Sequence, residues 1–162
     1  MPQTHHRCRS EPVPPHSDSA RQNWVAKTKD RRPLITPPLR ERLWPFLGGI
    51  ARQNQFKAIE VGGVEDHVHL LLSLPATLSM AKAMQLIKGG PSNWVHKTFP
   101  QQRLFGWQEE YGAFAVSVSL LDRTLAYVRG QAEHHQKLTY QQEFLALLKK
   151  HRIPYDERYL WT

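Results

Sequence analysis

Two histidines separated by one residue, His67 and His69, are the most chemically specific pair in the sequence. They belong to the apolar run HVHLLLSL (67–74), which ends at Pro75 and is typical of a β-strand. Side chains two apart in a strand project from the same face, so both imidazoles can reach one divalent cation or one phosphate. Alternatively, both are ordinary strand residues, with one bonded to Asp66. The pair needs a third group before it indicates a function.

Tyr127 and Gln131 supply that third group. They stand four residues apart in a segment with helical periodicity, so they lie on one face about one turn apart. A phenol suits attack on a phosphodiester, because phenolate is a tolerable leaving group and the covalent step stays reversible. The amide oxygen of Gln131 can complete a metal site without adding charge. A partly buried Tyr beside an exposed Gln is the alternative, favoured for this pair in isolation but not together with the histidines.

The elements that must position these side chains follow from hydrophobic periodicity, turn residues and caps. Expected in chain order are a helix over 38–54, strands over 56–61 and 67–74, a helix from 80 that is interrupted near 89–91 and can resume through Trp94, a strand over 112–117, and helices over 120–135 and 140–151. The last helix begins with a capping box at Thr139, and the tail over 155–161 reads as irregular. Helices interspersed with antiparallel-capable strands predict an α+β fold.

The first 33 residues differ from the rest of the chain. They contain five Pro, seven Lys or Arg and three Asp or Glu, with a single apolar cluster at Trp24–Ala26. Such a stretch buries too little apolar surface to offset the backbone entropy lost on ordering. We therefore expect a poorly ordered leader over 1–33 and one folded domain over 34–162.

Composition narrows the class of protein. The chain has 162 residues and a net charge of +8, and its length fits a single domain. No apolar run approaches the roughly 20 residues of a membrane helix, and no secretory signal opens the chain, so we expect a cytoplasmic protein without membrane contact. The lone Cys8 excludes an internal disulfide framework. The positive surplus favours nucleic acid as the partner.

Weaker signals concern how nucleic acid is bound. Basic side chains that can line a groove and an aromatic ring that can stack on an unpaired base are Lys82, Lys88, Arg123, Arg129 and Trp107. The alternatives are a scattered, solvated set of charges and an aromatic ring at the edge of the core.

The combined pattern resembles the single-tyrosine transposases of the HUH class, specifically the IS200/IS605 type that includes the REP-associated tyrosine transposases. The resemblance runs from about Thr28 to the C-terminus. It is carried by GGVEDHVHLLLSLP (62–75), SMAKAMQLIKGG (79–90), FGWQEEYGAFAVSVS (105–119), LAYVRGQAEHH (125–135) and IPYDERYLW (153–161).

The resemblance implies a ferredoxin-like palm, with an antiparallel sheet and packed helices, often assembled as a homodimer. It implies that His67, His69 and Gln131 hold Mg²⁺ or Mn²⁺ against the scissile phosphate of single-stranded hairpin DNA. Tyr127 then attacks the phosphorus, which leaves a 5′-phosphotyrosine and a free 3′-hydroxyl. A histidine-triad hydrolase, by contrast, needs a third alternating histidine, and Leu71 stands at that position.

The start of the chain departs from the family pattern. Family members open with a strand of the type YHLVFSTK, and the pattern here predicts that this first strand is missing. A shifted reading frame over about residues 5–27 is one hypothesis for the change. If the frame is shifted, an alternative function follows: the chain is a decayed, catalytically inactive copy that only binds hairpin DNA.

Overall fold

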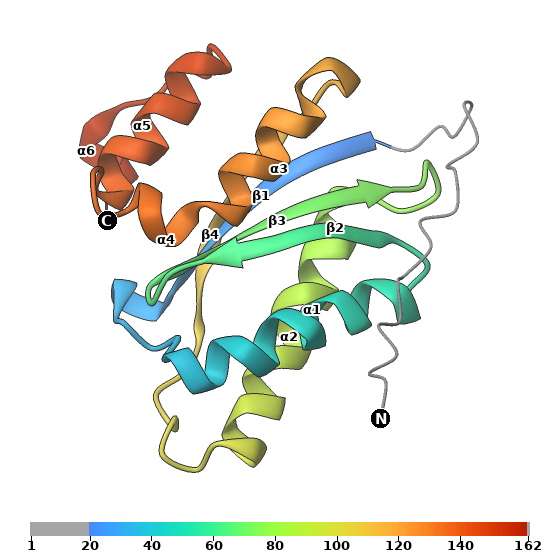
Figure 1. Cartoon of the computed structure of the whole chain (residues 1–162), viewed down its shortest axis with the longest axis vertical. Helices are drawn as coiled ribbons and strands as arrows, with labels where there is room; N and C mark the ends of the chain where they lie inside the picture. Colours follow the sequence, from blue (N-terminus) through green and yellow to red (C-terminus); the bar gives the residue numbers. More distant parts are fainter. Residues whose placement is uncertain (1–19, 162) are drawn as a thin grey trace, which may run out of the picture.

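The computed structural model describes residues 20–161, which form one sheet with helices on both faces (Figure 1). In chain order the elements are β1 (Ala20–Thr28), η1 (Lys29–Arg31), α1 (Pro37–Gln53), β2 (Lys57–Gly63), β3 (His67–Leu74), α2 (Met80–Thr98), β4 (Trp107–Ala115), η2 (Val118–Leu120), α3 (Leu121–Arg129), α4 (Gln131–His134), α5 (Tyr140–Lys150) and α6 (Glu157–Leu160). The expected α+β class is confirmed.

The sheet has the strand order β2-β3-β1-β4, and each neighbouring pair is antiparallel. Up to β4 the long elements follow each other as strand, helix, strand, strand, helix, strand, which is the ferredoxin-like arrangement. Helices α1 and α2 cover one face of the sheet, and α3, α4 and α5 lie on the other (Figure 1). The predicted palm is therefore confirmed.

Strand β1 corrects the expectation for the start of the chain. Residues Ala20–Thr28 form an inner strand, paired with β3 on one side and β4 on the other. The prediction of a missing first strand is wrong, because residues before position 34 contribute β1 to the sheet. The sequence did not indicate this strand because polar residues interrupt its apolar pattern. Asn23, for example, stands next to the buried Trp24. The leader prediction for residues 1–19 falls outside the described residues.

Alternation along β3 divides its side chains between the two faces. Val68, Leu70, Leu72 and Leu74 are buried in the main core, which they share with α1 and α2. By the period of two, His67 and His69 project from the opposite face, beneath α3, α4 and α5. The same hydrophobic strand thus anchors the core and presents two polar side chains to the second helical layer.

The main core also explains one difference from the expected helices. The helix over 38–54 is confirmed as α1, but α2 continues through Pro91 to Thr98 instead of breaking near residue 90. Its buried face runs along the helix as Ala83, Met84, Ile87, Pro91 and Val95. Because Pro91 itself belongs to this buried stripe, packing holds the helix together where local propensity disfavours it.

Three further elements differ in their limits. Strand β4 begins at Trp107, before the expected residue 112, because Trp107 pairs with Thr28 of β1. The helix expected over 120–135 divides at Gly130 into α3 and α4. The capping box at Thr139 is confirmed at the start of α5, and the tail contains the short helix α6.

None of the helices within residues 20–161 is long and apolar enough to span a membrane.

Candidate active site

His67 and His69 are both fully buried, and each ring is oriented by a hydrogen bond to its Nδ1 atom. Nδ1 of His67 lies 2.7 Å from a carboxylate oxygen of Asp66, and Nδ1 of His69 lies 3.4 Å from the amide oxygen of Asn23 on β1. Both partners are acceptors, so each Nδ1 carries the hydrogen and each Nε2 presents a lone pair. Neither Nε2 atom has a hydrogen-bond partner. Two buried nitrogen atoms without hydrogen-bond partners therefore face one region.

Electrostatics keeps this pair suited to bind a cation. Burial, together with the neighbouring His67 and His134, holds the pKa of His69 well below its usual value, so His69 is neutral near pH 7. Burial opposes the ionisation of Asp66, but the hydrogen bond from His67 and the nearby guanidinium of Arg31 outweigh it and lower the pKa of this carboxyl. Asp66 is thus an anion that fixes the orientation of His67.

Tyr127 reaches the histidines from α3. Its ring meets the ring of His69 edge to face, with 5.3 Å between the ring centroids, and its hydroxyl donates a hydrogen bond to Glu143. Helix α3 comes this close because the residue of β2 beneath it is Gly62, which has no side chain. A Cβ atom at this position would overlap the backbone carbonyl of Val128. Gly62 is paired with His69 in the sheet, so the glycine places the helix directly beside the histidine.

Glu143 on α5 is the central residue that sequence reasoning missed. Its side chain is 3% exposed, and its carboxylate lies between the histidines and Tyr127. Oε1 is 3.4 Å from Nε2 of His69, and Oε2 is 3.6 Å from Nε2 of His67. Burial raises the pKa of Glu143 to about 7. One carboxylate therefore contacts both histidines and the tyrosine that the sequence singled out.

The sequence does carry a signal for Glu143. The residue occupies the apolar stripe of α5, between Tyr140 and Leu147, where a core-facing helix normally places hydrophobic side chains. A charged side chain on such a stripe indicates either a polar partner or a site. Here the partners come from β3, α3 and α4, which no periodicity in α5 can reveal.

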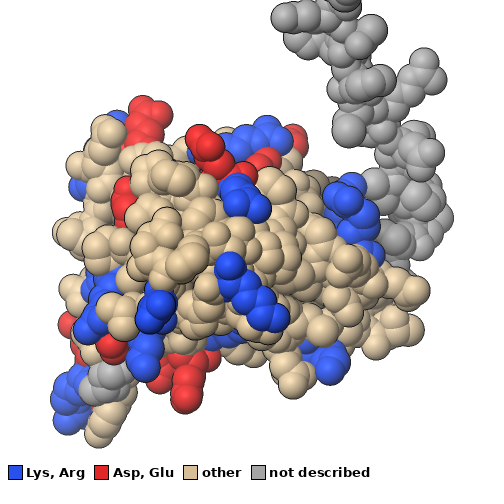
Figure 2. Space-filling view, turned by 90° about the horizontal axis from the view of Figure 1, so that it is seen from below, with Lys and Arg blue, Asp and Glu red and all other residues tan. Residues whose placement is uncertain are grey.

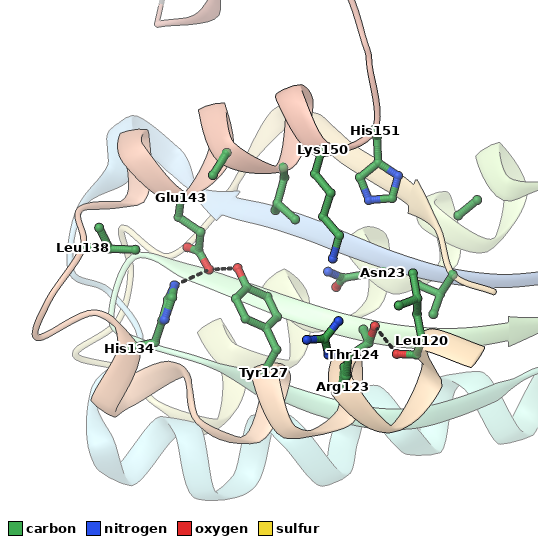
Figure 3. Close-up of a pocket in the computed structure, with 14 residues that line it drawn as sticks. Asn23, Leu120, Arg123, Thr124, Tyr127, His134, Leu138, Glu143, Lys150 and His151 are labelled. Atoms are coloured by element: carbon green, nitrogen blue, oxygen red, sulfur yellow. Dashed lines mark hydrogen bonds and ion pairs between the residues drawn. The ribbon is translucent and has the colours of Figure 1, made fainter. Parts of the chain in front are cut away.

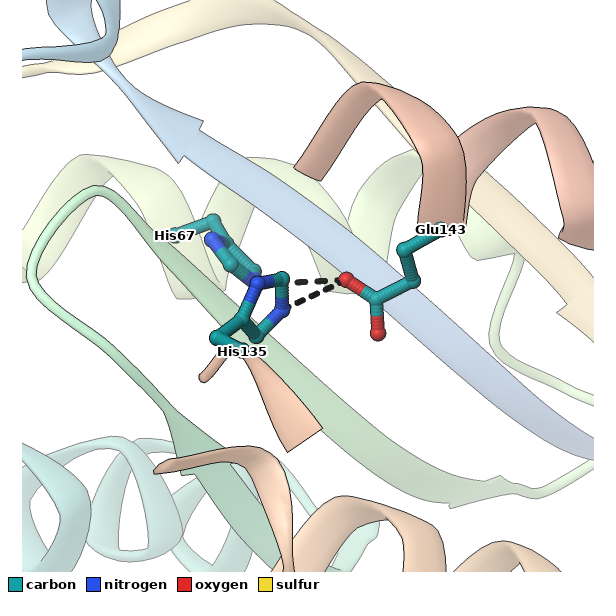
Figure 4. Close-up of side chains that lie close together, drawn as sticks. All are labelled: His67, His135 and Glu143. Atoms are coloured by element: carbon teal, nitrogen blue, oxygen red, sulfur yellow. Dashed lines mark ion pairs between the residues drawn. The ribbon is translucent and has the colours of Figure 1, made fainter. Parts of the chain in front are cut away.

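His135 adds a third imidazole. Its Nε2 atom lies 2.7 Å from Oε2 of Glu143 and 3.1 Å from the amide oxygen of Gln131. Burial and the nearby His67 lower the pKa of His135 to about 4, so it too is neutral near pH 7. Ligand atoms of His67, His135 and Glu143 lie within 4.8 Å of one another, as expected for groups that share one ion (Figure 4).

Gln131 is buried at this cluster, but its amide points differently from the expected ligand. Its Nε2 group donates to the backbone oxygen of Tyr127 and to Oε1 of Glu143, each at 3.2 Å, and its oxygen faces His135. The residue thus bridges α3, α4 and α5. The structure brings together all four residues expected at the centre of the site, with Glu143 in the middle.

The five weaker candidates for DNA contact are dispersed. Of the five, Arg123 alone lies close to the site, where it lines a cavity that opens beside Tyr127. Lys82 and Lys88 lie on α2, on the opposite face of the sheet. Lys88 is bound within the fold, because its ammonium group donates to the backbone oxygens of residues 108–110. Seen from the side of α1 and α2, Lys and Arg form separate groups rather than one continuous patch (Figure 2).

The other two candidates, Arg129 and Trp107, interact with other parts of the fold. Arg129 pairs with Glu60 of β2, with 2.5 Å between Nε and the carboxylate oxygen. Trp107 is partly buried against the main core, where its ring meets that of Phe105. The edge-of-core alternative therefore describes Trp107 better than a stacking platform does.

The sequence is similar to that of known transposases. A family model described as "Transposase IS200 like" matches residues 18–131. The ISDra2 transposase TnpA of Deinococcus radiodurans is 27% identical over 108 residues, which cover 64% of this chain and 77% of that protein.

Two solved structures share the fold. A proposed transposase from Deinococcus radiodurans R1 superposes with a TM-score of 0.58 at 19% identity, covering 74% of this chain and 95% of the other. A REP-associated tyrosine transposase bound to a REP hairpin gives a TM-score of 0.52 at 12% identity, covering 74% and 70%.

The limits of the family match bear on both ends of the chain. The match begins at residue 18 and includes the whole of β1, which contradicts a shifted frame over residues 18–27. It ends at Gln131, so Glu143 and His135 come from a part of the chain beyond the match. His67, His69 and Tyr127 lie within it.

Proposed function

The chain belongs to the family of IS200-like transposases, and on that premise we propose that it cleaves and rejoins single-stranded DNA at hairpin ends through a 5′-phosphotyrosine intermediate. The family makes it a DNA-cleaving and strand-transferring enzyme. One observation carries the finer mechanism: the hydroxyl of Tyr127 and the free Nε2 atoms of His67 and His69 meet at one carboxylate. The REP hairpin bound by a relative of the same fold supports hairpin DNA as the substrate.

Tyr127 is the proposed nucleophile, and Glu143 accepts its proton. The tyrosine oxygen forms a bond to phosphorus while the bond from phosphorus to the 3′ oxygen breaks, and the departing oxygen takes up a proton from solvent. The phenol proton passes to Oε1 of Glu143, which already accepts its hydrogen bond. A pKa near 7 suits a group that alternates between base and acid. Rejoining reverses these steps with the 3′-hydroxyl of a second end.

The donor set fits a divalent cation. Nε2 of His67 and Nε2 of His69 are buried without hydrogen-bond partners, as expected of atoms that serve as ligands, and the carboxylate of Glu143 lies beside both. Two imidazoles with one carboxylate suit Mn²⁺ better than Mg²⁺, which prefers oxygen ligands. A bound cation would supply positive charge to the scissile phosphate. Gln131, the third ligand implied by the family resemblance, stays a proposal beside Glu143.

The proposed chemistry is complete within one chain, because Tyr127 reaches the histidines of its own chain. The homodimer expected from the resemblance therefore stays a prediction that the mechanism does not require. A cytoplasmic location also stays a prediction.

Formation of a covalent adduct tests the proposal. Purified protein is incubated with single-stranded hairpin DNA and Mn²⁺ or Mg²⁺, and the products are separated under denaturing conditions. We expect a protein–DNA adduct with the wild-type chain and none with Tyr127→Phe. Hairpin affinity should be retained in this variant, because the ring and its packing against His69 remain.

Two outcomes would contradict the proposal. An adduct that survives in Tyr127→Phe would remove Tyr127 from its role as the nucleophile. Hairpin binding without any adduct, over a set of hairpins and both metals, would favour the inactive copy that only binds DNA. His67→Ala serves as a further variant: we expect cleavage to fall far more than hairpin affinity, whereas equal losses would indicate a structural histidine.

A further inference from the structure

A cavity of about 270 Å³ opens beside Tyr127, between α3 and α5 and over the ends of β1 and β4 (Figure 3). Its walls are largely apolar, formed by side chains such as Val116, Leu120 and Leu147. Tyr127 and Glu143 also line it, so the cavity adjoins the proposed reaction centre directly. Whatever occupies it lies next to the group that attacks the DNA strand.

Polar and positively charged groups stand among the apolar walls. Arg123 of α3 and Lys150 of α5 line the cavity from opposite sides. No salt bridge within residues 20–161 involves either of them, so both charges are available to an anion. Asn23 lies at the floor and is 3% exposed; its oxygen accepts from His69, which leaves its amide N–H groups to donate to a ligand.

We propose that this cavity receives the base of one unpaired nucleotide next to the scissile phosphate. The inference rests on the proposed function, because it takes Tyr127 to mark the position of that phosphate. A largely apolar cavity of this size can accept an extruded base, and a buried amide can bond to the edge of that base. Arg123 and Lys150 match the phosphates on either side of the nucleotide. The cavity is too small for a folded hairpin stem, so its occupant is a single nucleotide.

The cavity is formed in part by residues beyond the family match. Leu147 and Lys150 come from α5, which follows the end of that match at Gln131. The proposed contact with the base therefore depends on α5 as well as on the matched part of the chain. Stacking and edge contacts of this kind discriminate by shape and hydrogen bonding rather than by charge alone.

Binding measured without catalysis tests the inference. Tyr127→Phe protein is titrated with hairpin DNA carrying a single-stranded flank, in which one abasic residue is moved through the flank position by position. We expect one position at which loss of the base weakens binding about five- to tenfold or more. Ala146 also lines the cavity, so an indole at this position fills it. In the double variant Tyr127→Phe/Ala146→Trp, the intact strand should bind as weakly, and that position should cease to matter.

A matched variant separates filling of the cavity from a general effect of added bulk. Ala81 is an exposed alanine on α2, on the far face of the sheet, and Tyr127→Phe/Ala81→Trp should keep the dependence on the abasic position. Affinity that is insensitive to every abasic position, or equal effects of the two tryptophans, would overturn the inference. Absence of an adduct with wild-type protein would instead contradict the proposed function, and base-dependent affinity would still support the cavity.

Discussion

At the scale of single residues, the site consists of histidines whose orientation is fixed by neighbours in the sheet. Asp66 holds His67, and Asn23 of β1 holds His69, each through the Nδ1 atom. Loss of a group that orients a metal ligand in this way typically weakens metal binding by about 10- to 100-fold. A polar residue in the middle of an inner strand therefore has a role in the site rather than in the core.

Replacing Asn23 tests this role. Asn23→Ala removes the acceptor that fixes the His69 ring, so we expect Mn²⁺ affinity to fall about tenfold or more. Electron paramagnetic resonance of free Mn²⁺ measures the change directly and without DNA. Asn93→Ala, at an exposed position of α2, is the control. Equal affinities of the two variants would argue against an orienting role for Asn23.

The buried carboxylate of Glu143 predicts a pH dependence of stability. Its pKa is about 7 in the fold against 4.5 for the free side chain, so the folded state binds more protons than the unfolded state between these values. Linkage then lowers the free energy of unfolding as pH rises from about 4.5 to 7, by up to about 3 kcal/mol. The Glu143→Gln variant has no carboxyl group at this position, so its free energy of unfolding lacks this pH-dependent contribution. In metal-free protein, we expect the variant to gain stability relative to wild type as pH rises.

Urea unfolding of both proteins between pH 5 and pH 8 measures this difference. A difference in unfolding free energy that stays constant with pH would show that Glu143 ionises normally in the fold.

At the scale of elements, the approach of α3 to β2 decides whether Tyr127 reaches the histidines. Gly62 leaves space for the backbone of Val128, and the tyrosine is the residue just before Val128. Helix α5 brings Glu143 to the same point, and its start is fixed by the capping box between Thr139 and Gln142. Two helices from different parts of the chain thus converge over one pair of strands.

A methyl group at Gly62 tests the helix position. Gly62→Ala forces α3 away from the sheet, and we expect a loss of about 1–3 kcal/mol in the free energy of unfolding. Adduct formation should fall more steeply, because Tyr127 moves with the helix. Gly48→Ala is the control, since its Cβ atom meets no neighbour and alanine favours the helix. Normal cleavage by Gly62→Ala would show that α3 need not lie this close.

At the scale of the whole molecule, β1 joins the two halves of the sheet. It lies between β3 and β4, and its buried Trp24 and Ala26 belong to the main core while Val25 packs under α5. Strand β1 lies in the segment that composition predicts to be a leader, yet its side chains pack against both layers of helices. The charge of that segment belongs in part to the folded domain.

Truncation tests the position of the domain boundary. A chain that starts at residue 34 lacks β1, so we expect it to fail to fold cooperatively. A chain that starts at residue 18, where the family match begins, should unfold as a single transition near the wild-type temperature. Circular dichroism during heating distinguishes the two. Cooperative unfolding of the shorter chain would restore the boundary at residue 33.

The sequence by itself determined what is local. The alternation of HVHLLLSL placed both histidines on one face of a strand, the capping box marked the start of α5, and the i to i+4 spacing put Gln131 near Tyr127. These features depend on neighbouring residues and on fixed periods, so they can be read without knowing the fold.

Only the tertiary structure decided what depends on distant segments. Glu143 lies 76 residues beyond His67 in the chain (143 − 67), and no local pattern links them. Strand β1 is stabilised by pairing on both sides and by burial of Trp24, which outweigh its polar composition. Helix α2 likewise stays intact at Pro91 because packing exceeds local propensity. Long-range packing sets these features, and it enters only when the chain is folded.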